Sequence, residues 1–215
     1  MGCDCARNTL KRMQSRLRLA LFLAGLFALT AIAAVLLFAA GAKTVGSQSF
    51  AGASRPPTIP PAEFGMRDEH GRAVRLADLR GRPVVVTFLY TTCRDTCPLT
   101  VDQIRFALDE LGHDVPVVAV SVDPRNDTSR AAKRFTQQRR MSGRMRWVLG
   151  DEAGLQRLWQ AYGVQPQSDR EEHSATTVLL DGRGRQRVGF ATSVLTPQAL
   201  VHDIALLERE ERAAG

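Results

Sequence analysis

The hydrophobic and polar positions of residues 63–210 follow periods that predict strands alternating with helices. Two continuous β-branched runs, 83–90 and 116–122, are typical of central strands buried on both faces of a sheet. Between them, apolar residues recur at helical spacing from Leu99 to Leu111 and predict a helix. This alternation is the first indication of a sheet flanked by helices.

The rest of the segment completes an α/β pattern. Its expected elements are a hairpin over 64–76, a helix N-capped by Asp127 and running to about Met141, a strand over 146–149, a helix from Asp151 to Tyr162 ended by Gly163, a strand–turn–strand over 176–190, and an amphipathic helix opened by Thr196-Pro197. Together they predict an α/β fold, a mixed sheet flanked by helices in a thioredoxin-like order.

Residues 19–42 form an uncharged segment, rich in Leu, Ala, Phe, Val and Ile, that predicts a transmembrane helix. Its 24 positions exceed the roughly 20 apolar residues needed to span a bilayer. Basic residues gather before it and are sparse after it, which places the N-terminus in the cytoplasm and the domain outside. The alternative is a cleaved signal peptide ending at Ala40-Gly41-Ala42, although the apolar core of such peptides is only about 7–15 residues long. We therefore expect a single-pass protein of a bacterial inner membrane, with its folded domain facing the periplasm or the cell exterior.

Composition divides the chain into a basic cytoplasmic tail over 1–18, the anchor over 19–42, a tether over 43–62 and a folded domain over 63–210. The tether is rich in Gly, Ser and Pro and too poor in apolar residues to fold alone.

Of the net charge of +7, residues 1–43 carry +5. A domain with so little positive charge of its own is not expected to bind nucleic acid. The basic residues between Lys133 and Arg146 are interpreted as a solvated helix face and its exit loop, with a docking face for an acidic partner or for anionic lipid heads as the alternative.

Cys93 and Cys97 are the main candidates for chemistry, because they lie between the 83–90 strand and the helix that follows it. Pro98 suits the first turn of that helix, so Cys97 is expected at or near its N-cap. The positive end of the helix and the guanidinium of Arg94 should lower the pKa of both thiols. Two thiols on the oxidising side of a membrane are expected to be used, bridged or bound to a metal.

The CxxxC spacing permits both a disulfide and a metal site, and it favours the metal. In a regular helix, residues four apart place their Cβ atoms about 5–6 Å apart, whereas a disulfide needs about 3.5–4.5 Å, so closure requires a bent loop. A metal ion bonded at about 2.3 Å to each sulfur bridges the longer gap without strain.

A metal held by two thiolates needs a further donor, for which His173 is the candidate. It lies three residues before the 176–180 strand. In a parallel-type sheet, residues at the end of a strand that neighbours the cysteine loop can lie beside that loop. The other histidines, His70, His113 and His202, are interpreted as surface or packing residues.

Three motifs, in the same order along the chain, resemble the SCO/SenC family of membrane-tethered copper proteins. They are VVVTFLYTTCRDTCP over 84–98, VSVDPRNDT over 120–128 and HSAT over 173–176. The resemblance covers nearly all of 63–210. It implies a thioredoxin-like domain that binds copper, as Cu(I) or Cu(II), and helps to assemble the CuA centre of cytochrome c oxidase. The implied partner is the copper-bearing subunit of the oxidase or another copper protein.

The resemblance also implies roles for individual residues. Cys93, Cys97 and His173 match the copper ligands, a set of soft and borderline donors that suits Cu(I) and can hold Cu(II). Asp123 and Asp127 match an element associated in the family with partner recognition. The alternative for these two is a turn in which Asp127 caps the next helix.

Two functions from different classes fit these residues. The first is a copper chaperone, which binds and transfers metal without turnover of a small substrate. The second is a thiol–disulfide oxidoreductase that uses Cys93 and Cys97 as catalytic thiols to reduce exported or copper-site proteins; a peroxide-handling thiol enzyme is a third. The CxxxC spacing and the absence of a proline beside His173 argue against thioredoxin-type catalysis. Arg94 stands where the family usually has Pro, a departure that can shift redox behaviour or disfavour a bound cation.

Overall fold

The computed structural model describes residues 23–34, 49–166 and 176–214. The chain divides into two units, 1–48 and 49–215. In the first unit, residues 23–34 form a helix inside the predicted span of 19–42, and the rest of that span lies outside the described residues. Within the described ranges, no helix has both the length and the hydrophobicity required to cross a membrane.

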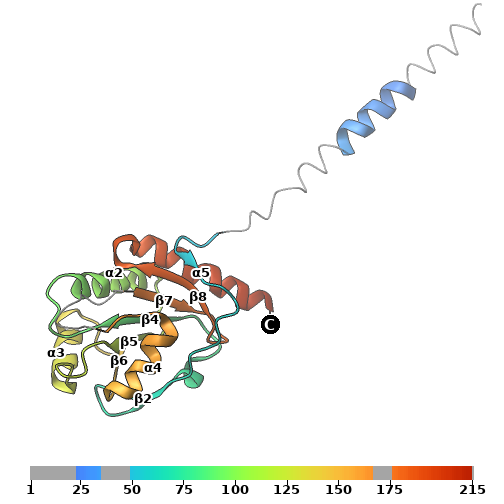
Figure 1. Cartoon of the computed structure of the whole chain (residues 1–215). Coiled ribbons are helices and arrows are strands. Elements are labelled where there is room, and N and C mark those ends of the chain that lie inside the picture. Colours follow the sequence, from blue (N-terminus) through green and yellow to red (C-terminus); the bar gives the residue numbers. More distant parts are fainter. Residues whose placement is uncertain (1–22, 35–48, 167–175, 215) are drawn as a thin grey trace, which may run out of the picture. The chain divides into compact units, whose positions relative to one another are not determined.

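The second unit is built on one mixed sheet, whose eight described strands have the order β1-β8-β7-β4-β5-β6-β2-β3 (Figure 1). The strands are β1 (Ala53–Ser54), β2 (Gly65–Asp68), β3 (Ala73–Arg75), β4 (Val84–Leu89), β5 (Val117–Ser121), β6 (Met145–Leu149), β7 (Thr176–Leu180) and β8 (Gln186–Ala191). β4, β5 and β6 run parallel, and every other neighbouring pair is antiparallel. The mixed sheet predicted from the strand pattern is confirmed.

Helices cover both faces of this sheet (Figure 1). They are α2 (Thr96–Leu111), α3 (Ser129–Gln138), α4 (Glu152–Tyr162) and α5 (Pro197–Ala214), with short 3-10 turns η1 (Leu76–Leu79) and η2 (Thr192–Val194). α2 and α5 contact each other and share one hydrophobic core with α3, whereas α4 packs into a second core on the opposite face. The sheet is thus the middle layer of three.

Strand β4 belongs to both cores, because all six of its side chains are buried. Leu89 packs in the core beneath α2, and its neighbour Phe88 packs in the core beneath α4, as the two-residue period of a strand requires. The only polar side chain of the strand, Thr87, shares a hydrogen bond of 3.1 Å with the hydroxyl of Thr177 on β7. The continuous apolar run read from the sequence is therefore a central strand, as expected.

Helix α3 differs from its prediction at both ends. Its N-cap is Thr128, whose hydroxyl accepts a hydrogen bond from the N–H of Ala131 at 3.2 Å, and not Asp127. The carboxylate of Asp127 is instead held in the interior by other partners, so it is not available to the helix. The helix ends at Gln138, ahead of the expected Met141, because the backbone turns into the left-handed region at Arg140 (φ 57°).

The predicted tether is partly a folded element, because its described residues dock on the domain as an N-terminal strap over 50–55. Strand β1 within the strap pairs with β8, and Phe50 packs against the core beneath α2. Both oxygens of the fully buried Asp203 accept strap N–H groups, from Ala51 at 2.8 Å and Gly52 at 3.0 Å. The folded unit therefore begins before the expected boundary at residue 63. Composition missed this because part of the strap is held by backbone N–H groups, which every sequence possesses.

We expect Gly52→Ala to destabilise the domain by about 1–3 kcal/mol, the usual effect of overpacking. A Cβ at this position would lie 2.5 Å from Val188 Cγ1 and 2.8 Å from the ring of Phe190, so the strap would have to move away from β8. Chemical denaturation of the full chain measures the change. The matched control is Gly65→Ala, where the nearest atom to the added Cβ is Arg75 Cγ at 3.6 Å. Equal stabilities of the two variants would contradict the docking of the strap.

Candidate metal centre

The candidate site lies where β4 ends and the chain turns into α2. We call residues 90–95, which connect these elements, the thiolate loop. Because β5 is parallel to β4, the loop that follows β5 leaves the sheet at the same edge. Because β7 is antiparallel to β4, with Thr177 opposite Thr87, the first residue of β7 also lies toward this edge. Three segments that are distant in sequence therefore meet at one edge of the sheet, the edge at which the thiolate loop leaves it.

The two cysteines occupy unequal positions at the N-terminus of α2. The helix begins at Thr96 with Asp95 as its N-cap, so Cys97 and Pro98 are its second and third residues. Proline is tolerated here as predicted, since the first-turn N–H groups have no partner within the helix. Cys97 is fully buried, whereas Cys93 in the thiolate loop is half-buried, and in the described structure the two are not joined by a disulfide.

The sulfur of Cys93 is held by donors from the first turn of α2. The N–H of Cys97 donates to Cys93 Sγ at 3.2 Å, and the hydroxyl of Thr96 lies 3.4 Å from the same atom. Sequence reasoning missed Thr96, although its position between the cysteines and its hydroxyl group were available as signals. These contacts favour the thiolate, because a sulfur anion accepts such hydrogen bonds more strongly than a neutral thiol does.

Hydrogen bonding drives the pKa values of the two thiols in opposite directions. The pKa of Cys93 falls to about 4, first because the Cys97 thiol donates to it and then because Thr96 and backbone N–H groups do the same, against the opposing effect of burial. The pKa of Cys97 is raised, since its thiol is the donor to Cys93 and is also buried. The pair thus behaves as one coupled unit that retains a single proton near neutral pH. Arg94 is exposed and is not among the main causes, so the expected contribution of its charge is secondary.

Asp123 and Asp127, predicted to take part in partner recognition or to form a turn, lie in the loop after β5 and are each only 6% exposed. Asp127 accepts hydrogen bonds from the N–H of Thr91 at 2.6 Å and from the hydroxyl of Ser121 at 2.5 Å. The carboxylate of Asp123 accepts a hydrogen bond from the side chain of Asn126 at 2.7 Å. Burial raises the pKa of Asp127, and the two hydrogen bonds partly oppose that change.

The remaining candidate ligand, His173, falls outside the described residues, which stop at 166 and resume at 176. In the part of the chain that the structure describes, no three His, Cys, Asp or Glu side chains form a group suited to a metal ion. His70, His113 and His202 are exposed and each lies beside a carboxylate, in line with the interpretation as surface residues. The described site therefore supplies two sulfur donors, which fit a soft metal ion such as Cu(I).

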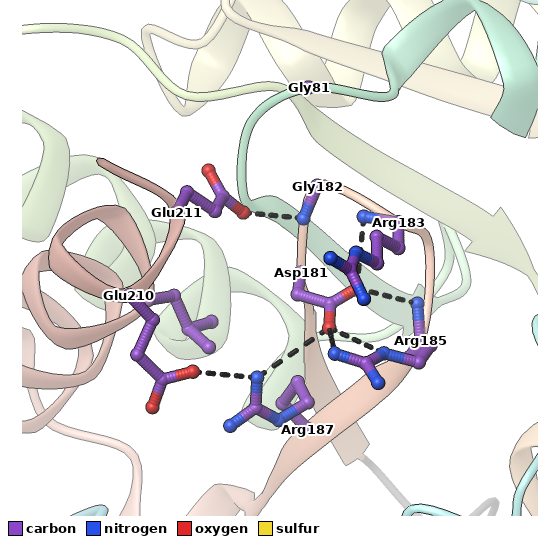
Figure 2. A pocket seen from close by; sticks show the side chains of 9 residues that line it. Gly81, Asp181, Gly182, Arg183, Arg185, Arg187, Glu210 and Glu211 are labelled. Carbon is purple, nitrogen blue, oxygen red and sulfur yellow. Dashed lines mark hydrogen bonds and ion pairs between the residues drawn. The ribbon is translucent and has the colours of Figure 1, made fainter. Parts of the chain in front are cut away.

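A pocket at the opposite end of the sheet contains no thiol or imidazole (Figure 2). Three of its residues, 181–183, directly follow β7, whose last residue, Leu180, pairs with the first residue of β4. Cys93, in contrast, follows the last residue of β4. The charges in the pocket compensate one another: Arg185 pairs with Asp181 at 2.7 Å and Arg187 with Glu210 at 2.8 Å. This pocket is therefore separate from the cysteine chemistry.

Three of the basic residues between Lys133 and Arg146 form ion pairs with carboxylates, Arg146 with Asp68 at 3.0 Å among them. Arg139 pairs with Asp102 at 3.1 Å, and Arg144 pairs with Asp109 at 2.6 Å.

We expect the alkylation of Cys93 by iodoacetamide to stay fast from neutral pH down to about pH 5 and to be lost as the pH falls through about 4. The reason is that only the thiolate reacts, and the thiolate persists above the pKa. Mass spectrometry of the reduced full chain locates the modified residue. In the control Cys97→Ala, which removes the strongest donor to the thiolate, the midpoint should move to higher pH. A midpoint near the ordinary thiol value of about 8.5 in the unaltered protein would contradict this electrostatic account.

Residues 53–207 match the family model described as SCO1/SenC. Protein SenC of Rhodobacter capsulatus is 31% identical over 128 residues, which cover 55% of this chain and 57% of SenC. The human mitochondrial protein SCO2 homolog is 30% identical over 126 residues, covering 56% of this chain and 47% of that protein. The chain thus aligns with about half the length of these relatives.

Solved structures agree with this match. ScoI of Bradyrhizobium japonicum, solved with copper bound, is 29% identical with a TM-score of 0.57, covering 68% of this chain and 96% of that structure. Apo Sco1 of Thermus thermophilus has a TM-score of 0.62 at 24% identity, covering 75% of this chain and 99% of that structure, and supports the thioredoxin-like fold alone. Since the family model covers well over half of the sequence, the chain belongs to the SCO1/SenC family.

Proposed function

We propose that this protein binds copper at Cys93 and Cys97, with His173 as the third ligand, and delivers it for assembly of the CuA centre of cytochrome c oxidase. The observation that carries the proposal is the coupled cysteine pair at the N-terminus of α2, in a chain of the SCO1/SenC family. Two sulfur donors at one turn match the preference of copper for soft ligands, as Cu(I) or, with an imidazole, as Cu(II).

Chain connectivity supports His173 as the third ligand. It precedes Thr176, the first residue of β7, by three positions, a distance that an extended chain covers in about 10–11 Å at most. In the antiparallel pairing of β7 with β4, Thr176 lies toward the end of β4 at which the thiolate loop begins. The histidine is therefore within reach of the edge of the sheet at which the cysteines lie.

The difference in pKa and exposure between the two thiols sets the order in which they bind and release copper. Cys93 is already a thiolate and is the more exposed of the two, so it meets an incoming copper donor first. Cys97 must lose its proton before it can bind the metal, so copper loading releases a proton. Handover to a recipient then proceeds by ligand exchange, in which a thiolate of the recipient replaces the accessible Cys93 before the buried Cys97.

We further propose that residues 19–42 anchor the protein as a single-pass helix in a bacterial inner membrane, with the copper site outside the cytoplasm. The support is the length of the uncharged segment, the excess of basic residues before it, and the helix observed over 23–34. Such an anchor would hold the domain on the side of the membrane where a copper-bearing oxidase subunit receives its metal.

The second candidate function is reduction of disulfides in exported or copper-site proteins. It is favoured by the same asymmetry, an accessible low-pKa thiol above a buried high-pKa thiol. The Cys93 thiolate would attack a substrate disulfide, forming a mixed disulfide and releasing one substrate thiolate. Cys97, once deprotonated, would then attack Cys93 Sγ, releasing the second substrate thiolate and leaving a Cys93–Cys97 disulfide.

We expect the reduced full chain in detergent to bind one copper ion with a sulfur-to-copper absorption band. Cys93→Ser, Cys97→Ser and His173→Ala should each lower the copper affinity by more than the about 10–100-fold that loss of an outer contact typically costs. The matched control is His113→Ala, which removes an exposed histidine paired with Glu208 and should leave copper binding unchanged. Copper titration against a competing chelator measures all four variants.

The outcomes separate the candidates. An unchanged affinity and spectrum in His173→Ala would exclude the three-ligand site. Rapid catalytic reduction of insulin disulfides by a protein that does not bind copper would contradict the chaperone and support the oxidoreductase.

A further inference from the structure

We propose that Asp127 is a positioning residue that fixes the thiolate loop, so that Cys93 is held against the N-terminus of α2. The proposal deepens the proposed function, on which its copper-binding consequences rest. It assigns Asp127 a role inside the protein, in place of the surface contact with a partner that the family resemblance implies.

The carboxylate of Asp127 joins the two loops that leave the parallel strands β4 and β5. One oxygen accepts the N–H of Thr91, two residues before Cys93, at 2.6 Å. The other accepts the hydroxyl of Ser121, the last residue of β5, at 2.5 Å. The bond to Thr91 spans 36 residues of sequence and holds the start of the thiolate loop in place.

The base of this contact is rigid. Ser121 is fully buried, and its carbonyl accepts the indole N–H of Trp159 on α4 at 2.9 Å. The N–H of Asp127 donates to the carbonyl of Asp123 at 2.9 Å, which closes the turn after β5. The carboxylate is therefore fixed by the sheet and by α4 before it engages the thiolate loop.

One short turn links the hydrogen bond between Asp127 and Thr91 to the position of Cys93 Sγ. Within the loop, the N–H of Cys93 donates to the carbonyl of Tyr90 at 3.3 Å, so pinning Thr91 also limits where Cys93 can lie. The loop must bring Cys93 Sγ within reach of the Cys97 N–H, the donor 3.2 Å away. Loss of the Asp127 contact would let the loop drift and would weaken that hydrogen bond.

Burial argues against direct partner recognition by this carboxylate. Asp127 is 6% exposed and both of its oxygens are used by internal donors. A partner could reach it only by breaking these bonds, which would leave the donors Thr91 N–H and Ser121 hydroxyl without their acceptor, an unfavourable change in a buried site.

Replacing Asp127 by Asn or by Ala distinguishes the two roles. Asn has the same shape: its carbonyl can accept from Thr91 and its amide can donate to the Ser121 hydroxyl, so the loop stays fixed while the charge is lost. Ala removes both contacts. We therefore expect Asp127→Asn to resemble the unaltered protein and Asp127→Ala to raise the pH midpoint of Cys93 alkylation by about one unit or more, a tenfold or greater fall in the ratio of thiolate to thiol at the original midpoint.

Copper affinity supplies a second readout on the same full-length proteins. Asp127→Ala should weaken copper binding by about 10–100-fold, the usual effect of an outer-shell partner, and Asp127→Asn should restore most of it. The matched control is Asp123→Ala, which removes a carboxylate whose hydrogen-bond donor is Asn126, outside the thiolate loop. It should leave both readouts unchanged.

The pattern expected for partner recognition is the opposite one. If both Asp127 variants keep the alkylation midpoint and copper affinity but fail to transfer copper, the positioning role is wrong.

Circular dichroism verifies folding. If Asp127→Ala does not fold, Ser121→Ala replaces it: this variant removes one support of the carboxylate and should still raise the midpoint, and an unchanged midpoint would overturn the proposal. Since alkylation requires no metal, the positioning role can be confirmed or refuted even if the copper proposal fails.

Discussion

The parallel pairing of β4 with β5 is the constraint on which the rest of the site depends. Every side chain of β4 is buried, so a shift by one residue would send each face of the strand into the wrong core. With this register fixed, Leu89 pairs with Ser121, and the N–H of Val122 continues the pairing to the carbonyl of Leu89 at 3.0 Å. The loops that leave the two strands must therefore meet, and the chemistry of the protein is assembled between them.

At that edge the protein stabilises a sulfur anion with hydrogen-bond donors, and no cation is among the main causes of its lowered pKa. The donors come from the first turn of α2, whose N–H groups have no acceptor within the helix, and from the buried thiol of Cys97. The same arrangement suits soft-metal binding and disulfide exchange, because both begin with an accessible thiolate. What separates the two functions is the third donor and the partner, and both lie beyond the cysteine pair itself.

Much of the fold followed from short-range patterns. The 83–90 and 116–122 runs became central strands, and Asp151 and Gly163 cap the two ends of α4 as predicted. These elements were predictable because periodicity and capping act over a few residues. The predictions failed where distant groups competed: Thr128 took the N-cap because the carboxylate of Asp127 was engaged by Thr91 and Ser121. Likewise, residues 50–55 lacked the composition of a folded segment but found their acceptor in Asp203, 152 residues beyond Ala51.

The sequence by itself determined the order of elements, the location of both cysteines at a strand-to-helix turn, and the motifs shared with the SCO1/SenC family. His173 as a ligand and the anchor over 19–42 stay predictions from sequence. Only the tertiary structure decided that Cys93 is the thiolate and Cys97 the buried thiol, and that Asp127 faces inward. The physical reason is that local patterns depend on neighbours along the chain, whereas a proton or a buried carboxylate is placed by hydrogen bonds between segments that only folding brings together.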